Sequence, residues 1–90
     1  MKTVWKYEIG REGREGRDLD VPKGAKFLDA QIQNGVLCLW ALVDPDAGSQ
    51  GIRVNILGTG WQVDEIAGEY LATVQPGGGL VFHIFIEYDV

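Results

Sequence analysis

The sequence has little of the chemistry on which many small domains rely. It holds one cysteine, one histidine, one serine and three prolines in 90 residues. A single cysteine excludes an intramolecular disulfide and cannot by itself build a structural zinc site. The longest apolar run, Val36 to Val43, has eight residues, far short of the roughly 18 to 20 that a membrane helix needs. We therefore expect a soluble domain that does not bind a membrane.

The N-terminus lacks the features of an export signal. Lys2 is followed by neither an apolar segment nor a small-residue cleavage site. Ninety residues are enough for one hydrophobic core. We expect residues 1–90 to form a single cytoplasmic domain.

Basic residues are scarce beyond residue 26. Residues 1–26 hold seven of the eight lysines and arginines against five acids, whereas residues 27–90 hold only Arg53 against eight acids. The acidic residues 27–90 would repel the phosphate backbone of DNA or RNA, which argues against binding a nucleic acid polymer. A small anionic ligand is not excluded, since a few arginines at one pocket act locally.

What the sequence does contain is a series of short segments typical of strands. They alternate apolar and polar residues or form short apolar runs between turn residues. The expected strands are Thr3 to Ile9, Asp18 to Val21, Lys26 to Gln33, Val36 to Val43, Ile52 to Leu57, Tyr70 to Gln75 and Leu80 to Tyr88. This spacing predicts an all-β domain, an antiparallel β-sandwich or small barrel of six to seven short strands, with at most one helical turn, between Trp61 and Gly68.

The turn Asn34-Gly35 fixes one hairpin in detail. Asn-Gly favours a type I′ turn, and Asp44-Pro45 ends the following strand because proline lacks the amide a ladder needs. A two-residue loop places Gln33 opposite Val36, and the rest of the register follows from that pair. The apolar run is expected to be a central strand and the last strand central or buried at an interface.

This register sorts the side chains of the hairpin onto two faces. The predicted core face holds Leu28, Ala30 and Ile32 with Leu37, Leu39, Ala41 and Val43. The other face holds Asp29, Gln31 and Gln33 beside Cys38, Trp40 and Leu42. Gln31, Gln33 and Trp40, with Arg53 and Asn55 as further members, combine an aromatic plane, amides and a guanidinium, the groups that recognise a nucleobase and a phosphate. An ordinary polar outer face with one exposed tryptophan is the alternative.

No pair of residues has the spacing of a catalytic motif. Ser49 lies in a loop, Cys38 is expected to be a small buried hydrophobe, and His83 is expected to be a structural histidine, with ligand contact as the alternative. Asp44-Pro45-Asp46 resembles the start of a calcium loop but lacks its closing glutamate. We expect no enzyme activity, no cofactor and no metal.

Glycine-rich segments are the remaining candidates. The tandem Gly-Arg-Glu repeat of residues 10–17 is expected to be a solvated connector or an arginine-bearing flap over a ligand, and it lacks the ending of a P-loop. Gly58-Thr59-Gly60-Trp61 and Pro76-Gly77-Gly78-Gly79 could bring backbone amides close to a ligand, although glycine-rich turns of this kind occur without any ligand in most β proteins.

The sequence resembles a family of small proteins from tailed bacteriophages, single-domain chains of largely unknown function. The specific part of the resemblance is the segment 39–45, Leu-Trp-Ala-Leu-Val-Asp-Pro, with weaker similarity from Trp5-Lys6-Tyr7-Glu8 to Val81-Phe82-His83-Ile84-Phe85. The Gly-Arg-Glu insertion and Phe82, where the pattern has tryptophan, depart from the family. The resemblance implies a role in the cytoplasm of an infected bacterium.

Three functions fit this context. The first is a homo-oligomer that counteracts host defence by sequestering a small signalling nucleotide. In it Trp40 or Trp5 would stack on the base, Arg53 or a loop arginine would bind phosphate, Gln31 and Gln33 would bind the base, and His83 would be a further contact. The second is a binding module that inhibits a host or defence protein through a sheet edge or the mixed face. The third is a minor virion component.

Overall fold

The computed structural model describes residues 1–10 and 17–90, and it has no helix in these ranges. The tandem Gly-Arg-Glu repeat lies almost entirely outside the described residues. The strands are β1 (Thr3–Gly10), β2 (Arg17–Pro22), β3 (Lys26–Gln33), β4 (Val36–Val43), β5 (Ser49–Gly58), β6 (Glu69–Gly77) and β7 (Leu80–Tyr88). The prediction of an all-β chain of six to seven short strands is confirmed.

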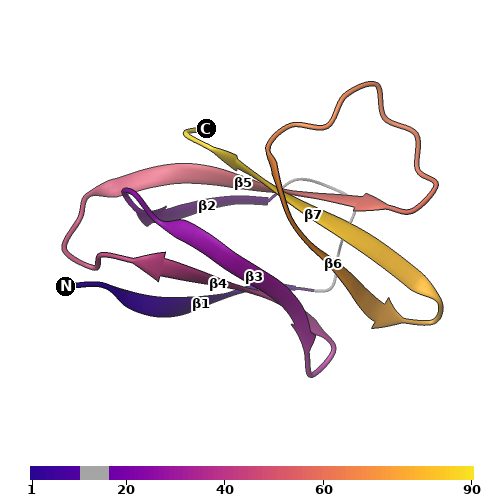
Figure 1. The fold of residues 1–90 in the computed structure, drawn as a ribbon, viewed down its shortest axis with the longest axis horizontal. Helices are drawn as coiled ribbons and strands as arrows, with labels where there is room; N and C mark the ends of the chain where they lie inside the picture. Colours follow the sequence, from indigo (N-terminus) through magenta and orange to yellow (C-terminus); the bar gives the residue numbers. More distant parts are fainter. Residues whose placement is uncertain (11–16) are drawn as a thin grey trace.

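The strands form two antiparallel sheets that face each other as an open sandwich rather than a closed barrel. One sheet has the order β1-β4-β3 and the other the order β2-β5-β7-β6 (Figure 1). Strands β4 and β7 are interior members of their sheets. This agrees with the apolar run that forms β4 and with the apolar residues on both faces of β7. The edge strands β3 and β6 lie side by side, so the two sheets approach most closely along that side.

The hairpin between β3 and β4 has the predicted register. Gln33 pairs with Val36, Gln31 with Cys38 and Asp29 with Trp40. Both turn residues have positive φ, 53° at Asn34 and 78° at Gly35, which is the requirement of a type I′ turn. The residue pattern thus determined the pairing of the two strands correctly.

The prediction that Leu28 lies on the core face is wrong. Between the pairs Phe27–Ala41 and Asp29–Trp40 the register shifts by one residue at Leu28. This β-bulge changes the phase of side-chain alternation, so Phe27 turns into the core and Leu28 is exposed. Strict period-2 alternation has no means of anticipating the extra residue.

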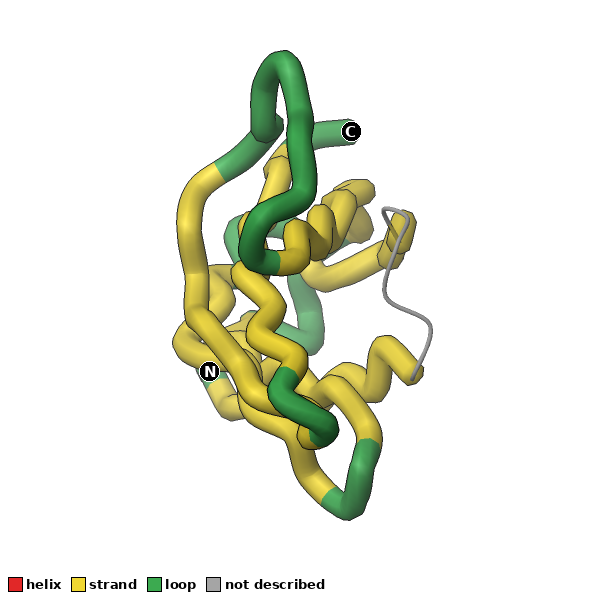
Figure 2. The backbone as a smooth tube through the Cα atoms, turned by 90° about the vertical axis from the view of Figure 1, so that its right-hand side faces the viewer, coloured by secondary structure: helices red, strands yellow, loops and turns green. Residues whose placement is uncertain are grey.

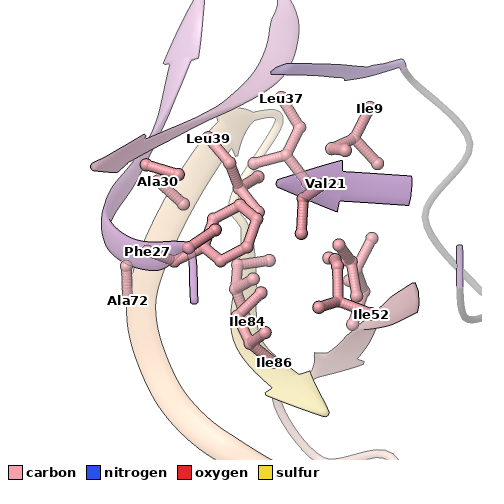
Figure 3. Packing of buried hydrophobic residues seen from close by; sticks show 14 of the residues in the cluster. Ile9, Val21, Phe27, Ala30, Leu37, Leu39, Ile52, Ala72, Ile84 and Ile86 are labelled. Carbon is pink, nitrogen blue, oxygen red and sulfur yellow. The ribbon is translucent and has the colours of Figure 1, made fainter. Parts of the chain in front are cut away.

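A single hydrophobic core fills the space between the sheets. Leu39 and Ala30 from one sheet and Ile52, Ile84 and Ile86 from the other are fully buried (Figure 3). Phe27 lies in the middle of this cluster, between Tyr7 and Tyr88 at ring-centroid distances of 6.0 and 6.3 Å. Since both inner faces are apolar, every polar candidate side chain of the sheets is directed to one of the two outer faces.

Candidate functional site

The outer face of the three-stranded sheet brings together Gln31, Gln33 and Trp40, as predicted. Across this face Lys6 of β1 and Asp29 of β3 are the register partners of Trp40. Trp40 is half-buried between these two oppositely charged residues. We call this outer face, with Trp40 at its centre, the platform.

Polar side chains on this platform bind one another. Lys6 Nζ donates to Gln33 Oε1 at 2.9 Å and lies 3.6 Å from Glu8 Oε1, and Gln31 Nε2 donates to Asp29 Oδ2 at 2.9 Å. The Lys6–Gln33 hydrogen bond joins the two outer strands of the sheet, across β4. Cys38 faces this side, between Glu8 and Gln31, and is buried, as predicted for a small hydrophobe.

The remaining candidates do not lie on this platform. Arg53 and Asn55 are in β5 and His83 is in β7, all on the outer face of the four-stranded sheet, which points to the other side of the sandwich. Trp5 is paired with the core residue Ala41 and therefore lies on the inner side of edge strand β1, where it is partly exposed. The grouping of Arg53 and Asn55 with the platform is therefore wrong.

Arg53 is held by a carboxylate. Its Nε donates to Asp18 Oδ1 at 2.7 Å and its Nη2 to Asp18 Oδ2 at 3.3 Å. The hydrogen bond from Arg53 lowers the pKa of Asp18 below its ordinary value, and the same bond raises the pKa of Arg53. A phosphate that used this guanidinium would have to displace the aspartate.

His83 forms hydrogen bonds at both ring nitrogens. Nε2 lies 2.8 Å from Thr59 Oγ1 and Nδ1 lies 3.0 Å from Thr73 Oγ1, which in turn lies 2.7 Å from Tyr70 Oη. Every one of these groups can donate or accept, so the chain of bonds is satisfied with either imidazole tautomer. These bonds agree with the expectation of a structural histidine.

The segment of residues 59–68, between β5 and β6, is an extended loop without the helical turn that was the alternative prediction. It projects from the sandwich in Figure 1, where it is the orange loop, and forms a long green stretch beyond the strands in Figure 2. Its side chains are exposed throughout, including the large apolar Trp61, Val63 and Ile66. The strand pattern of the sequence assigns no role to Val63 and Ile66, although two apolar residues in a segment without strand alternation are a usable signal of a surface function.

The loop begins with a compact turn. Trp61 N donates to Gly58 O at 3.0 Å, and Gly60 has a φ of +85°. The indole of Trp61 covers Gly58 so closely that a Cβ there would lie 2.4 Å from Trp61 Cε2. It also contacts Phe82, with ring centroids 5.7 Å apart at 60°. The Gly-Thr-Gly-Trp segment thus seats an aromatic ring on the end of β5.

Two open pockets border this loop. One, of about 280 Å³, is lined by Trp61, Leu80 and Phe82 together with glycines of the two adjoining turns, and the other by residues 61–65. Throughout residues 1–10 and 17–90, no three histidine, cysteine or acidic side chains are gathered to hold a metal ion. The same residues include no helix able to cross a membrane.

The architecture defines the class of protein, a small antiparallel β-sandwich domain with polar side chains on both outer faces and one projecting loop that carries exposed apolar side chains. Residues 1–90 match the model of a family described as a domain of unknown function, DUF7352. The chain belongs to this family. No curated protein and no solved structure matches it.

Proposed function

We propose that this chain is a non-catalytic binding protein that docks on a protein partner through its projecting loop. The observation that carries the proposal is a set of exposed apolar side chains, Trp61, Val63 and Ile66 of the loop with Leu80 of β7. Their exposed fractions are 37, 51, 37 and 54%. Val63 and Leu80 each border a pocket that Trp61 also lines. We call these four residues the loop surface. Aromatic and aliphatic side chains gathered on a projecting segment are typical of protein interaction sites.

Charge indicates the kind of partner. The loop carries Asp64 and Glu65, Glu69 follows it, and residues 54–90 contain no lysine or arginine. A second copy of the chain would bring like charges together at this surface. A complementary partner offers an apolar groove bordered by lysines and arginines.

The resemblance to small proteins of tailed bacteriophages supports a host or defence protein as the partner, met in the cytoplasm of the infected bacterium. Inhibition by occupation of a basic site requires no chemistry from the bound domain. It agrees with the lack of a catalytic motif in the sequence. A minor virion component would instead co-purify with particles.

The test is affinity capture from host lysate with two matched double variants. Val63→Ser with Ile66→Ser removes the middle of the loop surface, whereas Val4→Ser with Leu28→Ser removes residues of similar size and exposure, 49 and 48%, from the three-stranded sheet. We expect a stoichiometric basic protein with the wild type and the control, and at least about tenfold weaker binding with the loop variant, or ~1.4 kcal/mol. Equal capture by both variants would overturn the proposal.

A second candidate function is sequestration of a small signalling nucleotide by a homo-oligomer. It is favoured by one observation, the platform that places Trp40 beside Lys6 and on one face with Gln31 and Gln33. Isothermal titration with cyclic nucleotides and ADP-ribose isomers tests it. We expect binding that Trp40→Ala abolishes and Arg53→Ala leaves unchanged, since Arg53 lies on the other face; no heat across the panel would reject this function.

A further inference from the structure

We infer that His83 is a positioning residue for the loop surface, because its imidazole contacts Thr59, at the first end of the loop 59–68, and Thr73 of β6, which in turn contacts Tyr70 just after the loop. What the positioned loop binds rests on the proposed function. The positioning role itself rests on the hydrogen bonds of His83 with Thr59 and Thr73, which we call the clasp.

The first end of the loop is held at Thr59, which directly follows β5. Its Oγ1 lies 2.8 Å from His83 Nε2 and 3.4 Å from the carbonyl oxygen of Val81, and its backbone N donates to the same carbonyl at 3.1 Å. Val81 and His83 belong to β7, so the start of the loop is fixed to the interior strand of the sheet.

On the other side of the loop, His83 contacts β6 at Thr73, five residues beyond the loop. His83 Nδ1 lies 3.0 Å from Thr73 Oγ1, and Thr73 Oγ1 lies 2.7 Å from Tyr70 Oη. The ring of Tyr70 meets Phe85 of β7 edge-on at 5.7 Å. Tyr70 lies two residues after the loop ends and is paired with Phe85 of β7, so the hydrogen bond through Thr73 adds the imidazole of His83 to the contacts that orient Tyr70.

A histidine suits this position because of the shape of its ring. Its two nitrogens point in different directions, toward Thr59 on one side and Thr73 on the other, and both hydroxyls can rotate to donate or accept. A phenylalanine would fill the same space without either bond. Fixing the first end of the loop and the strand that follows it removes conformational freedom that the loop would otherwise lose on binding.

Asn55 adds a separate tie near the end of the loop. Its Nδ2 lies 3.0 Å from the carbonyl oxygen of Ala67 and 3.3 Å from Glu87 Oε1. Since this tie is independent of His83, loss of the histidine should loosen the loop without releasing it from the sheet. The expected result is a local change in dynamics rather than unfolding.

The experiment is amide hydrogen exchange of the purified chain, with His83→Phe compared with the wild type and with Gln75→Ala, an exposed residue of β6 outside these hydrogen bonds. The amides to follow are those of Thr59 and Trp61, which donate to Val81 O and Gly58 O. We expect their exchange to rise about tenfold in His83→Phe, with β4 unchanged, and no rise in Gln75→Ala. Unchanged exchange in the loop, or an equal rise in every strand, would overturn the inference.

A second variant covers failure of His83→Phe to fold. Thr59→Val with Thr73→Val keeps the histidine and removes both of its partners, and it should give the same local rise; a loop as protected as in the wild type would overturn the inference. Partner affinity is then measured for His83→Phe and should fall severalfold. If no partner is captured by the wild type, the proposed function fails while the exchange result still decides the role of His83.

Discussion

Gly58 is the residue whose replacement tests the geometry of the loop most sharply. It is the buried last residue of β5, and a Cβ there would lie 2.4 Å from Cε2 and 2.7 Å from Nε1 of Trp61. Ordinary van der Waals contact begins near 3.4 Å, so in Gly58→Ala the indole ring must move by about 1 Å. Gly58 does not have a positive φ, so alanine adds no backbone strain and the effect reports on the ring alone.

The displacement removes the packing of Trp61 on Phe82, a tilted pair of rings 5.7 Å apart. An aromatic pair contributes about 0.5 to 1.5 kcal/mol beyond its buried area. We expect the free energy of unfolding to fall by about 1 kcal/mol, which lowers Tm by about 4 to 8 °C in a domain of this size.

Chemical denaturation measures the loss. In a Trp5→Phe, Trp40→Phe background, Trp61 emission should move to longer wavelength. Gly48→Ala is the control, because a Cβ at Gly48 meets nothing within 4 Å. Unchanged emission and stability in Gly58→Ala, or an equal loss in Gly48→Ala, would refute the seating of Trp61 on Gly58.

Three further predictions concern the core and the surface. Leu39 is fully buried, so Leu39→Ala should cost about 2 to 5 kcal/mol in denaturant unfolding; a loss below that of Gly58→Ala would contradict its place in the core. Tyr7 Oη is buried without a hydrogen-bond partner among residues 1–10 and 17–90, and burial raises the pKa of Tyr7, so Tyr7→Phe should leave stability unchanged or raise it by about 1 kcal/mol, and a clear loss would reveal a missed partner. The pKa of Asp18 in the folded chain lies below its ordinary value of 3.8 because of Arg53, so its ion pair adds stability above that pH and loses it as the pH falls through the lowered value. The stability difference between wild type and Asp18→Asn should therefore vanish in strong acid, and a difference that grows as the pH falls would show that the sign is wrong.

Local signals in the sequence were sufficient for the strands and for one pairing. A type I′ turn requires positive φ at two successive residues, and Asn34-Gly35 is the pair that adopts it most readily. The two-residue turn then determines the register of β3 against β4. The same register correctly placed Gln31, Gln33 and Trp40 on one face. These features depend only on residues close in the chain.

Features that depend on residues far apart in the chain could not be predicted from local sequence patterns. Alternation shows that Arg53 faces away from a core, but it does not show which sheet β5 joins, and the topology places Arg53 opposite the platform. The bulge at Leu28 adds a residue that no period-2 pattern contains. The partners of His83 come from β6 and from the connection between β5 and β6, so its proposed positioning role appears only once the strands are assembled.

The most direct test of docking through the loop is site-specific photo-crosslinking in cells of the proposed bacterial host. A photoreactive benzoylphenylalanine is placed at position 63, in the loop surface, or at position 4, on the outer face of the three-stranded sheet. We expect an adduct of one defined mass with a basic protein from position 63 and none from position 4. Adducts from position 4 alone, or the same adduct from both positions, would contradict docking through the loop.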